Sequence, residues 1–565
     1  MQHKIKNLRG NISGGVLAAI ISLPMALAFG VQSGLGAQAG IYTAIILGFV
    51  TGIIGGTKTL ISDPTGPMTV VAATVVSLSI SSTGNLENAL PLIIGTFALA
   101  SLFEFTFGIL NFGKYVRFMP YPVVSSFMAG IGLIIISMQL FPMLGYDSPS
   151  NMISIISNIG SPLSDPNIPA LTLCLLTLAL IYIIPKINKK LPNILIAMVT
   201  ATVISSCLGL DVPVIGSIPT SLPSLQLHHI SMLTWSDLNL MIGPALMLGG
   251  LGVIDSLLTS VVADNLTNTK HNSKRTIIGQ GLGNFAVAIF GGIPGAGATM
   301  GTVTNIKGGA TTKSSAIIKA VSLLIIIFSL ASSVQVIPMS VLAAVLLHVG
   351  ISIIDFKGMA TLHKIPKQDA AVWLIVLLVT LFDNLLNAVA IGFTLASVLF
   401  IGKLSTKMTT SQKKIRLKDL VDNNTIPNEV AKSIYVQHIE GPMFFGFANQ
   451  FREFCSEMNN MLIVIIRMEG IPFMDQSGLL TLRDVAREWH TRGIQVYITG
   501  ASSDIKLAMT SAGITPNIVS SEFCYDSFND CTNEIQGRVS NTTETEYHSV
   551  LMDQSVLHNR KLQVA

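Results

Sequence analysis

Residues 62–71 (SDPTGPMTVV) and 292–303 (GIPGAGATMGTV) are two Pro- and Gly-rich interruptions inside long hydrophobic sequence. Each interruption leads into a new apolar run that opens near a threonine. A helix that begins inside a bilayer directs unpaired N–H groups, and roughly half a positive charge, at whatever lies before it. Two such half-helices that face each other would bind a small anion without a basic side chain. The matched pair therefore predicts a transport site near the middle of a membrane.

The composition places most of the chain in a membrane. The 565 residues are 50% hydrophobic and 11% charged, with a mean hydropathy of +0.63. Such values exceed those of soluble proteins of this size. The net charge of +4 does not indicate a nucleic-acid partner, and five scattered cysteines without a CxxC motif predict reduced thiols. No Walker motif or catalytic constellation is found, so we expect a transporter that is not an enzyme.

Fourteen hydrophobic runs are long enough to cross or half-cross a bilayer. Fourteen divides into two sets of seven, and an odd number in each set inverts the second set relative to the first. The third and tenth runs follow the two interruptions and are expected to be half-helices, each preceded by a short extended break. The expected runs are 12–30, 39–57, 65–81, 89–112, 120–144, 168–185, 192–209, 238–261, 276–291, 298–309, 314–333, 337–355, 369–386 and 388–403.

The basic residues predict the orientation of these segments. Lys and Arg fall in or beside alternate connections, from Lys58 through to Lys367, whereas the connections 31–38, 82–88, 145–167 and 210–237 contain neither. Basic residues accumulate on the cytoplasmic side of membrane proteins. We therefore expect a multi-pass protein of the cell (inner) membrane, with both termini in the cytoplasm.

Asp255 is the most informative single residue, because it lies well inside the eighth segment. A carboxylate there costs about 2.5–3.5 kcal/mol on insertion scales, so it should face a cavity and have a partner. The spans beside it offer no basic side chain, which leaves a proton, a cation or hydrogen bonds. Thr259 lies one turn further on the same helix face. Glu104 is a second acid inside a segment, whereas Asp63 is expected to be a turn or cap residue.

The residues that flank the two interruptions are the expected ligands of the anion. Gly and Ala leave backbone N–H groups accessible, and threonine hydroxyls can donate to an anion. The two helix N-termini together offset about one negative charge. Asp255 then needs a positive companion, so cation and anion would strengthen each other's binding. The candidates around the breaks are Thr65, Gly66, Thr69, Gly297, Ala298 and Thr299.

From Lys403 onwards the sequence predicts a separate cytosolic domain. Residues 433–441, 462–470 and 494–500 have strand patterns, and they alternate with helical patterns at 448–461, 477–493 and 503–513. Alternating strands and helices predict an α/β sheet covered by helices. We expect a transport domain over 1–403, a linker over 404–429, an α/β domain over 430–531 and a disordered tail over 532–565.

These motifs resemble the SulP family, solute carrier family 26. The resemblance lies in residues 23–45, 62–71, 254–273 and 294–306, and the soluble domain resembles a STAS domain. It implies an all-α, polytopic membrane domain that has a seven-plus-seven inverted repeat with core and gate subdomains. It also implies elevator-like motion and a homodimer with cytosolic STAS domains.

The likeness is strongest to sodium-dependent bicarbonate transporters of this family. It implies Na⁺ at Asp255, Thr259, Gly297, Ala298 and Thr299, and bicarbonate near Thr65, Gly66, Thr69, Ala298 and Thr299. Many relatives have Arg where this chain has Gly301, and Glu where it has Asp255. The missing Arg charge favours a sodium ion as the source of positive charge.

Ser477 resembles a serine that is phosphorylated in related anti-sigma antagonists. It also stands at the start of a predicted helix, where it would be an N-cap, and we favour the cap. Two other functions remain open from sequence. One is a proton-coupled importer of sulfate or a dicarboxylate. The other is a membrane-tethered signalling protein whose STAS domain senses a ligand.

Overall fold

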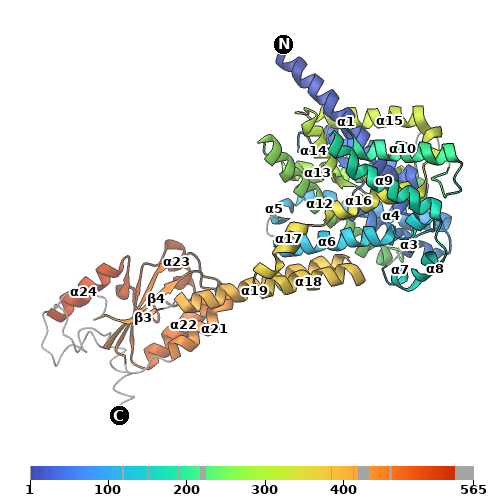
Figure 1. Ribbon diagram of the computed structural model, residues 1–565. Helices are drawn as coiled ribbons and strands as arrows, with labels where there is room; N and C mark the ends of the chain where they lie inside the picture. The colour runs from blue at the N-terminus through green and yellow to red at the C-terminus, as the bar shows by residue number, and fades with distance from the viewer. Residues whose placement is uncertain are drawn as a thin grey trace. The chain divides into compact units, whose positions relative to one another are not determined.

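The computed structural model describes residues 2–116, 120–149, 152–188, 191–216, 224–383, 385–411, 413–417, 433–456 and 461–540. The chain divides into two compact units, residues 1–396 and 397–565. Figure 1 labels the elements of both units. The first unit is helical, and the second contains a five-stranded sheet.

Each of the fourteen expected runs overlaps one long helix, and the last of these, α19, begins in the first unit and ends in the second. The long helices are α1 (Gln2–Gln32), α2 (Ala37–Ile54), α3 (Gly66–Thr83), α4 (Leu86–Ile109), α6 (Tyr121–Met138), α9 (Ile168–Ile187), α10 (Asn193–Leu208), α12 (Leu238–Thr267), α13 (Ser273–Ile289), α14 (Thr299–Lys307), α15 (Ser314–Gln335), α16 (Met339–Ile353), α18 (Lys367–Phe382) and α19 (Leu385–Ser411). Short helices connect them: α5 (Gly113–Val116), η1 (Pro142–Leu144), α7 (Met152–Asn158), α8 (Gly160–Ser164), α11 (Leu227–Ser231), α17 (Phe356–Thr361) and η2 (Leu362–Lys364).

Length and composition qualify eight of the described helices as membrane spans, or nine if α16 and the bent segment after it count as one. The total of fourteen membrane segments therefore stays a prediction. The third segment is a full 18 residues as α3, and the tenth is a 9-residue helix, α14. Only the tenth is thus short in the structure, although both begin after an extended break.

The two interruptions meet in the structure and pair with each other. Strand β1 (Ser62–Asp63) lies antiparallel to β2 (Ala296–Gly297), with Ser62 opposite Gly297 and Asp63 opposite Ala296. We call these four residues the crossing. Gly295, just before β2, is required here, because a Cβ atom at this position would lie 2.5 Å from the Asp63 carbonyl oxygen. The crossing brings the N-termini of α3 and α14 into one region, although 232 residues separate β1 from β2 in sequence.

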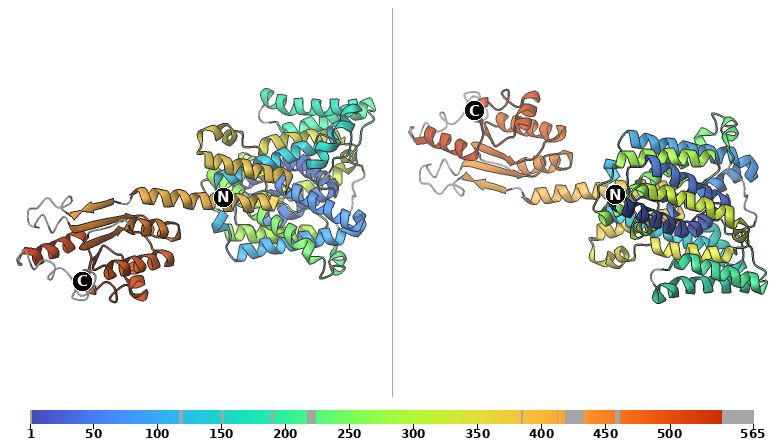
Figure 2. Two further views of the ribbon diagram at one scale, coloured as in Figure 1. Left: turned by 90° about the horizontal axis from the view of Figure 1, so that it is seen from below. Right: turned by 90° about the horizontal axis from the view of Figure 1, so that it is seen from above.

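The helices of the first unit form two packed groups. Helices α1 to α4 pack mainly on one another and on α12 to α15. Helices α6, α9, α10, α16 and α18 form the second group. The crossing and α12 belong to the first group, and Figures 1 and 2 show α1 alongside α15 within it.

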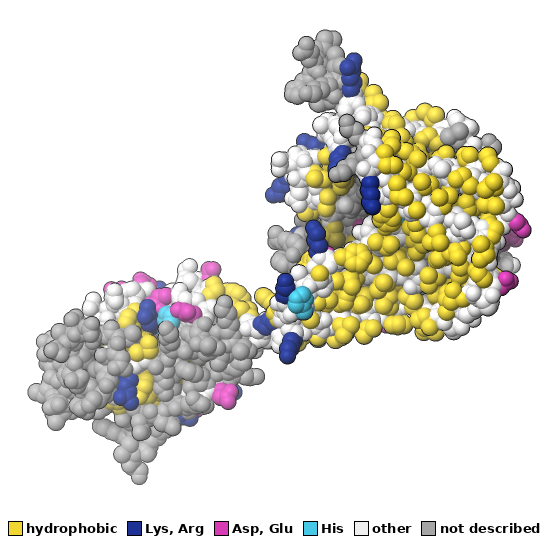
Figure 3. All heavy atoms as spheres, in the orientation of Figure 1, with side chains coloured by type: hydrophobic (Ala, Val, Ile, Leu, Met, Phe, Trp, Pro, Cys, Tyr) yellow, Lys and Arg dark blue, Asp and Glu magenta, His cyan; other side chains and the backbone are white. Residues whose placement is uncertain are grey.

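The surface of the first unit carries a broad apolar face. Figure 3 shows hydrophobic side chains over most of this face, with Lys and Arg gathered at one end and Asp and Glu at the other. Exposed large apolar side chains are numerous on its helices, such as Leu102 on α4 and Phe400 on α19. A surface of this kind requires lipid around it, and its charge asymmetry agrees with the pattern of basic connections.

The second unit has the sheet order β3-β4-β5-β6-β7. The strands are β3 (Lys413–Arg416), β4 (Ile434–Glu440), β5 (Ile463–Gly470), β6 (Gln495–Thr499) and β7 (Cys524–Tyr525), and the helices are α21 (Phe445–Ser456), α22 (Gln476–Thr491), α23 (Ser503–Ser511), η4 (Ser521–Phe523) and α24 (Phe528–Ser540). Strands β4 to β7 are parallel, and β3 pairs antiparallel with β4 at the edge. The apolar runs at 462–470 and 494–500 become β5 and β6, which are buried because helices cover the sheet.

Two expected boundaries of the second unit are wrong. The polar stretch 404–429, expected to be a linker, begins with the end of α19, which extends to Ser411, and it supplies β3, whose backbone pairs with the edge of β4. The expected disordered tail over 532–565 begins too early, because α24 extends to Ser540 and buries Cys531 and Ile535. Residues 541–565 lie outside the described part of the chain.

Candidate functional site

The N-terminus of α3 forms one wall of the candidate site. Thr65 is the N-cap residue, but its side chain makes no capping hydrogen bond, and Pro67 in the first turn fixes the backbone without an N–H group. The hydroxyl oxygens of Thr65 and Thr69 are buried and have no hydrogen-bond partner in the described structure. Buried hydroxyls are nearly always paired. Two unpaired hydroxyls therefore lie at this helix N-terminus, beside Gly66, where they can donate to an anion.

Asp255 on α12 lies against this wall. Its side chain is buried, with 8% of the residue exposed, and it lies close to the Thr65 hydroxyl without a hydrogen bond between the two. One carboxylate oxygen, Oδ2, has no partner among the described residues. A narrow, apolar gap beside it is lined by Pro67 and by residues of α6 and α19, including Phe127 and Val389. Asp255 therefore faces the interior of the bundle, as its position in the eighth segment predicts.

The opposite wall is built by α12 and the segment that leads into α14. The Thr259 hydroxyl donates to the Gly297 carbonyl oxygen at 2.8 Å, and it lies 2.9 Å from the Thr299 hydroxyl. The Gly297 N–H donates to Ser256 Oγ at 3.1 Å, and the Ala298 N–H donates to the Ile61 carbonyl at 2.8 Å. The N–H groups of Gly297 and Ala298, expected to be accessible to a ligand, are thus occupied by Ser256 and Ile61.

This second wall presents oxygen atoms rather than N–H groups. Hard cations prefer carboxylate, carbonyl and hydroxyl oxygens, and Asp255, Thr259, Gly297 and Thr299 supply all three kinds. No cluster of three or more His, Cys, Asp or Glu side chains suited to a metal occurs among the described residues. A single carboxylate matches the charge of one monovalent ion. The donor set therefore fits a sodium-like cation better than a multivalent metal.

A buried ion pair that sequence reasoning missed anchors the crossing. Lys319 on α15 is fully buried and forms an ion pair with Asp63, while its ammonium also donates to the Ala44 carbonyl at 2.8 Å. The Ser22 hydroxyl donates to the second Asp63 carboxylate oxygen at 2.6 Å. Asp63 is therefore an internal anchor, and the expectation of a turn or cap residue is wrong. The sequence did contain a signal for this pair, because a lysine inside the expected membrane segment 314–333 needs a buried partner.

Helix α13 holds both breaks through two amide side chains one turn apart. Gln280 Nε2 donates to Ser62 Oγ at 2.7 Å. The Asn284 amide receives a hydrogen bond from the Gly295 N–H and donates to the Gly295 carbonyl, both at 2.9 Å. It also donates to a carboxylate oxygen of Glu104 at 2.8 Å. Two amides four residues apart in a hydrophobic span lie on one helix face, so the sequence could have predicted a polar, buried face on α13.

Gly301 lies where the structure leaves little room for a side chain. A Cβ atom at this position would lie 2.9 Å from Ile61 Cγ2 and 3.4 Å from Asp63 Oδ2. A larger side chain would displace the backbone just before β1. The absence of a side chain lets α14 approach the first break closely.

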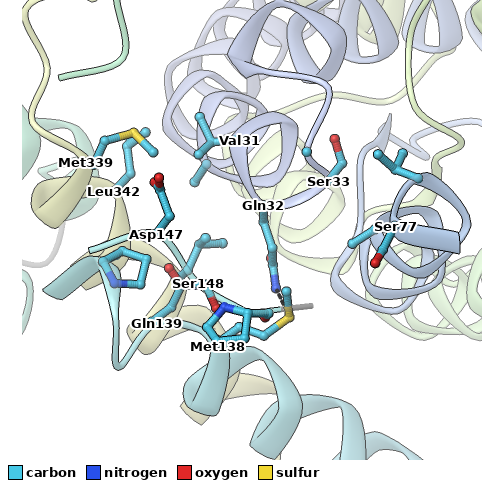
Figure 4. A pocket seen from close by; sticks show the side chains of 18 of the residues that line it. Val31, Gln32, Ser33, Ser77, Met138, Gln139, Asp147, Ser148, Met339 and Leu342 are labelled. Carbon is cyan, nitrogen blue, oxygen red and sulfur yellow. Dashed lines mark hydrogen bonds between the residues drawn. The ribbon is translucent and has the colours of Figure 1, made fainter. Parts of the chain in front are cut away.

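A cavity of about 360 Å³ opens further along α3, on the side of its C-terminal turns. It is lined by α1, α3, α6 and α16 and thus lies between the two helix groups. Figure 4 shows Gln32 from α1 and Gln139 and Asp147 from the opposite wall lining it. The Gln32 amide points toward the Met138 sulfur at 3.6 Å. The amide, hydroxyl and carboxylate groups make this cavity suitable for water and small hydrophilic solutes.

Ser477 in the second unit is not the N-cap, contrary to our expectation. Asp475 caps α22, because its side chain accepts a hydrogen bond from the Gly478 N–H at 2.8 Å. Asp475 also accepts from the Phe445 N–H at 3.0 Å. Ser477 lies in the first turn and is half-buried. The carboxylate displaces the serine from the capping role because it accepts both backbone donors at once.

A helical membrane domain with two interrupted helices crossing at its centre, followed by an α/β domain, defines a class of polytopic transport proteins. A model described as the sulfate permease family matches residues 8–376, and a STAS domain model matches residues 425–531. The chain therefore belongs to the sulfate permease family.

Known relatives agree with this assignment. The bicarbonate transporter BicA of Synechocystis sp. is 37% identical over 530 residues, which cover 92% of this chain and 93% of the relative. The solved transmembrane domain of a cyanobacterial BicA is 42% identical and covers 69% of this chain and 97% of its own, with a TM-score of 0.62. The murine solute carrier 26 family member A9, solved in the inward-facing state, has the same fold, with a TM-score of 0.81 at 18% identity; the match covers 94% of this chain and 91% of the murine one.

Proposed function

We propose that this protein takes up bicarbonate together with sodium as a secondary active transporter. The observation that carries the proposal is Asp255, a buried acid with an unpaired oxygen, between the unpaired hydroxyls of Thr65 and Thr69 and the oxygen-rich wall of Thr259 and Thr299. The likeness to transporters that are named for bicarbonate supports the choice of anion.

In this mechanism the two walls have separate roles. The N-terminus of α3 binds the anion through Thr65, Gly66 and Thr69, where the helix dipole and the hydroxyls meet its negative charge. Sodium binds between Asp255 and the oxygens of α14 and its approach, and it neutralises the buried carboxylate. Because each ion removes an electrostatic penalty from the other, binding of one raises the affinity for the other by the same factor. This coupling is the physical basis of symport.

The two helix groups supply the movement that the cycle requires. The group that contains the crossing moves as a core past the second group, which acts as the gate, in an elevator-like manner. We propose that the 360 Å³ cavity between the groups is part of the path by which solutes enter. We further propose that the protein is a homodimer of the cell membrane, with both termini in the cytoplasm and STAS domains in contact. Ser477 is proposed as a regulatory site, because it stands beside the Asp475 cap.

Uptake by purified protein in liposomes tests this proposal. Radiolabelled bicarbonate uptake should require an inward sodium gradient and should fall to background in Asp255→Asn. Glu87→Gln, which removes an exposed acid from the first turn of α4, is the matched control and should transport normally. Sodium-independent sulfate uptake would favour the proton-coupled importer. Unchanged uptake by Asp255→Asn would remove this residue from the mechanism.

A further inference from the structure

Glu104 is a second buried acid of the membrane unit, and the proposed symport leaves it without a role. Only 1% of the residue is exposed. One carboxyl oxygen, Oε2, accepts a hydrogen bond from Asn284 at 2.8 Å, whereas Oε1 has no hydrogen-bond partner in the described structure. An ionised carboxylate can accept about four hydrogen bonds. A single bond from a neutral amide leaves such a charge almost entirely uncompensated.

The carboxyl group of Glu104 is pressed against α12. Helices α4 and α12 approach closely at Gly249 and Gly252, where a Cβ on Gly252 would lie 2.7 Å from Glu104 Oε1. Gly252 therefore leaves the space beside the carboxyl group, whereas Gly249 lies against the backbone of α4. On that side the backbone of α12 borders the carboxyl group directly.

The elements packed on α4 bring no described cation to this acid. Helix α3 contains no titratable side chain, and α12 contributes Asp255, one turn beyond Gly252.

The basic residues of the other neighbouring elements lie away from Glu104. On α13, Lys274 and Arg275 are at the N-terminus, at least nine residues before Asn284, which corresponds to about 14 Å along the helix. His228 and His229 of α11 lie beside the N-terminal half of α4, where Leu233 contacts Gly95. Lys319, the fully buried lysine, is paired with Asp63.

We propose that Glu104 is a proton-binding site and that, at neutral pH, it stays a neutral carboxylic acid throughout the transport cycle. In this form it holds the Asn284 amide, which in turn fixes both backbone groups of Gly295 before β2. Glu104 is thus a positioning residue for the second break. Its proton is structural and is not carried across the membrane.

Loss of this proton would also change the charge beside the transport site. Residues three apart on a helix lie on the same face, so Gly252 places the Glu104 carboxyl within about one turn of Asp255. A second negative charge there would repel the anion and attract the cation. At alkaline pH we therefore expect the KM for bicarbonate to rise and the half-saturating sodium concentration to fall. This expectation, in which the KM for bicarbonate and the half-saturating sodium concentration change in opposite directions, rests on the proposed symport.

Infrared spectroscopy tests the proton without relying on transport. The purified wild-type protein at neutral pH should show a protonated-carboxyl C=O band that is absent from Glu104→Gln and retained in Glu87→Gln. If no such band exists in the wild-type protein, the proposal is overturned, whatever the outcome of the uptake assay. The measurement on wild-type protein stands even if Glu104→Gln does not fold.

Transport across pH 7 to 9 supplies the second test, in a range where bicarbonate remains the main carbonate species. Wild-type KM for bicarbonate should rise at least fivefold at the alkaline end, whereas Glu104→Gln, which mimics the neutral acid, should keep near-neutral values within twofold. Glu87→Gln should follow the wild type. Loss of uptake by a folded Glu104→Gln protein at pH 7 would show that the ionised form is needed and would overturn the proposal. Failure of sodium dependence alone would contradict the symport and leave the infrared result intact.

Discussion

The two breaks resemble each other in sequence, yet the structure anchors them by different physics. The first break is fixed by charge, since Asp63 pairs with the buried Lys319. The second break is fixed by hydrogen bonds between neutral groups, chiefly the two between the Asn284 amide and the backbone of Gly295. The two breaks also differ in what they leave unsatisfied. Thr65 and Thr69 at the first break have unpaired hydroxyls, whereas Thr299 at the second is paired with Thr259.

The difference suggests how the proposed mechanism assigns one ion to each break. In the proposed mechanism, the break that is anchored by an ion pair keeps its hydroxyls unpaired and binds the anion. The other break, whose Gly297 and Ala298 N–H groups are occupied, presents oxygens and binds the cation. Removing one anchor or one ligand at a time tests this assignment of the two breaks to two ions.

The largest effect is expected from Lys319→Met. Removing one partner of a buried ion pair costs about 3–5 kcal/mol, because the other charge stays buried and uncompensated. The yield of folded protein and its thermal midpoint in size-exclusion assays should therefore fall sharply. The double variant Asp63→Asn/Lys319→Met should recover most of the loss, since no charge remains buried. A double variant no better than Lys319→Met would show that the pair does not anchor the first break.

An intermediate effect is expected from Asn284→Leu, which removes the anchor of the second break at nearly constant volume. The Gly295 N–H and carbonyl would lose their partner, and unsatisfied buried groups cost about 1–3 kcal/mol each. Thermal stability should fall by more than in Gln280→Leu. That matched variant on the same helix face removes one hydrogen bond to the first break. Equal losses in the two variants would mean that amides anchor both breaks alike.

The smallest effects are expected when a single threonine hydroxyl is removed. These variants should distinguish the anion site from the cation site. Thr69→Val removes an unpaired hydroxyl, so stability should hold while the KM for bicarbonate rises by up to about tenfold, which is the value of one hydrogen bond. Thr299→Val should instead raise the half-saturating sodium concentration. Uptake measured at varied anion and varied sodium distinguishes the two. A shift of the same parameter in both variants would contradict separate walls.

Much of the fold followed from residue pattern alone. Each of the fourteen apolar runs coincides with a helix, and the apolar runs at 462–470 and 494–500 become the central strands β5 and β6. Pro64, Pro67 and Pro294 mark the two places where a helix cannot continue. Asp255 was found because a charge within a hydrophobic span is rare. These features are local, and local sequence is sufficient to specify them.

Local residue pattern was enough to predict where the chain passes between apolar and polar surroundings, where its helices break, and that Asp255 has no nearby counter-charge. The partners of the buried polar groups depend on how the helices pack. Lys319 reaches Asp63 across 256 residues, and Asn284 binds both Gly295 and Glu104. Tertiary structure also decided that the Ala298 N–H is consumed and that Asp475 caps α22. Hydrogen bonds and ion pairs form between whichever groups packing brings within about 3 Å, and that proximity is not written in any single segment.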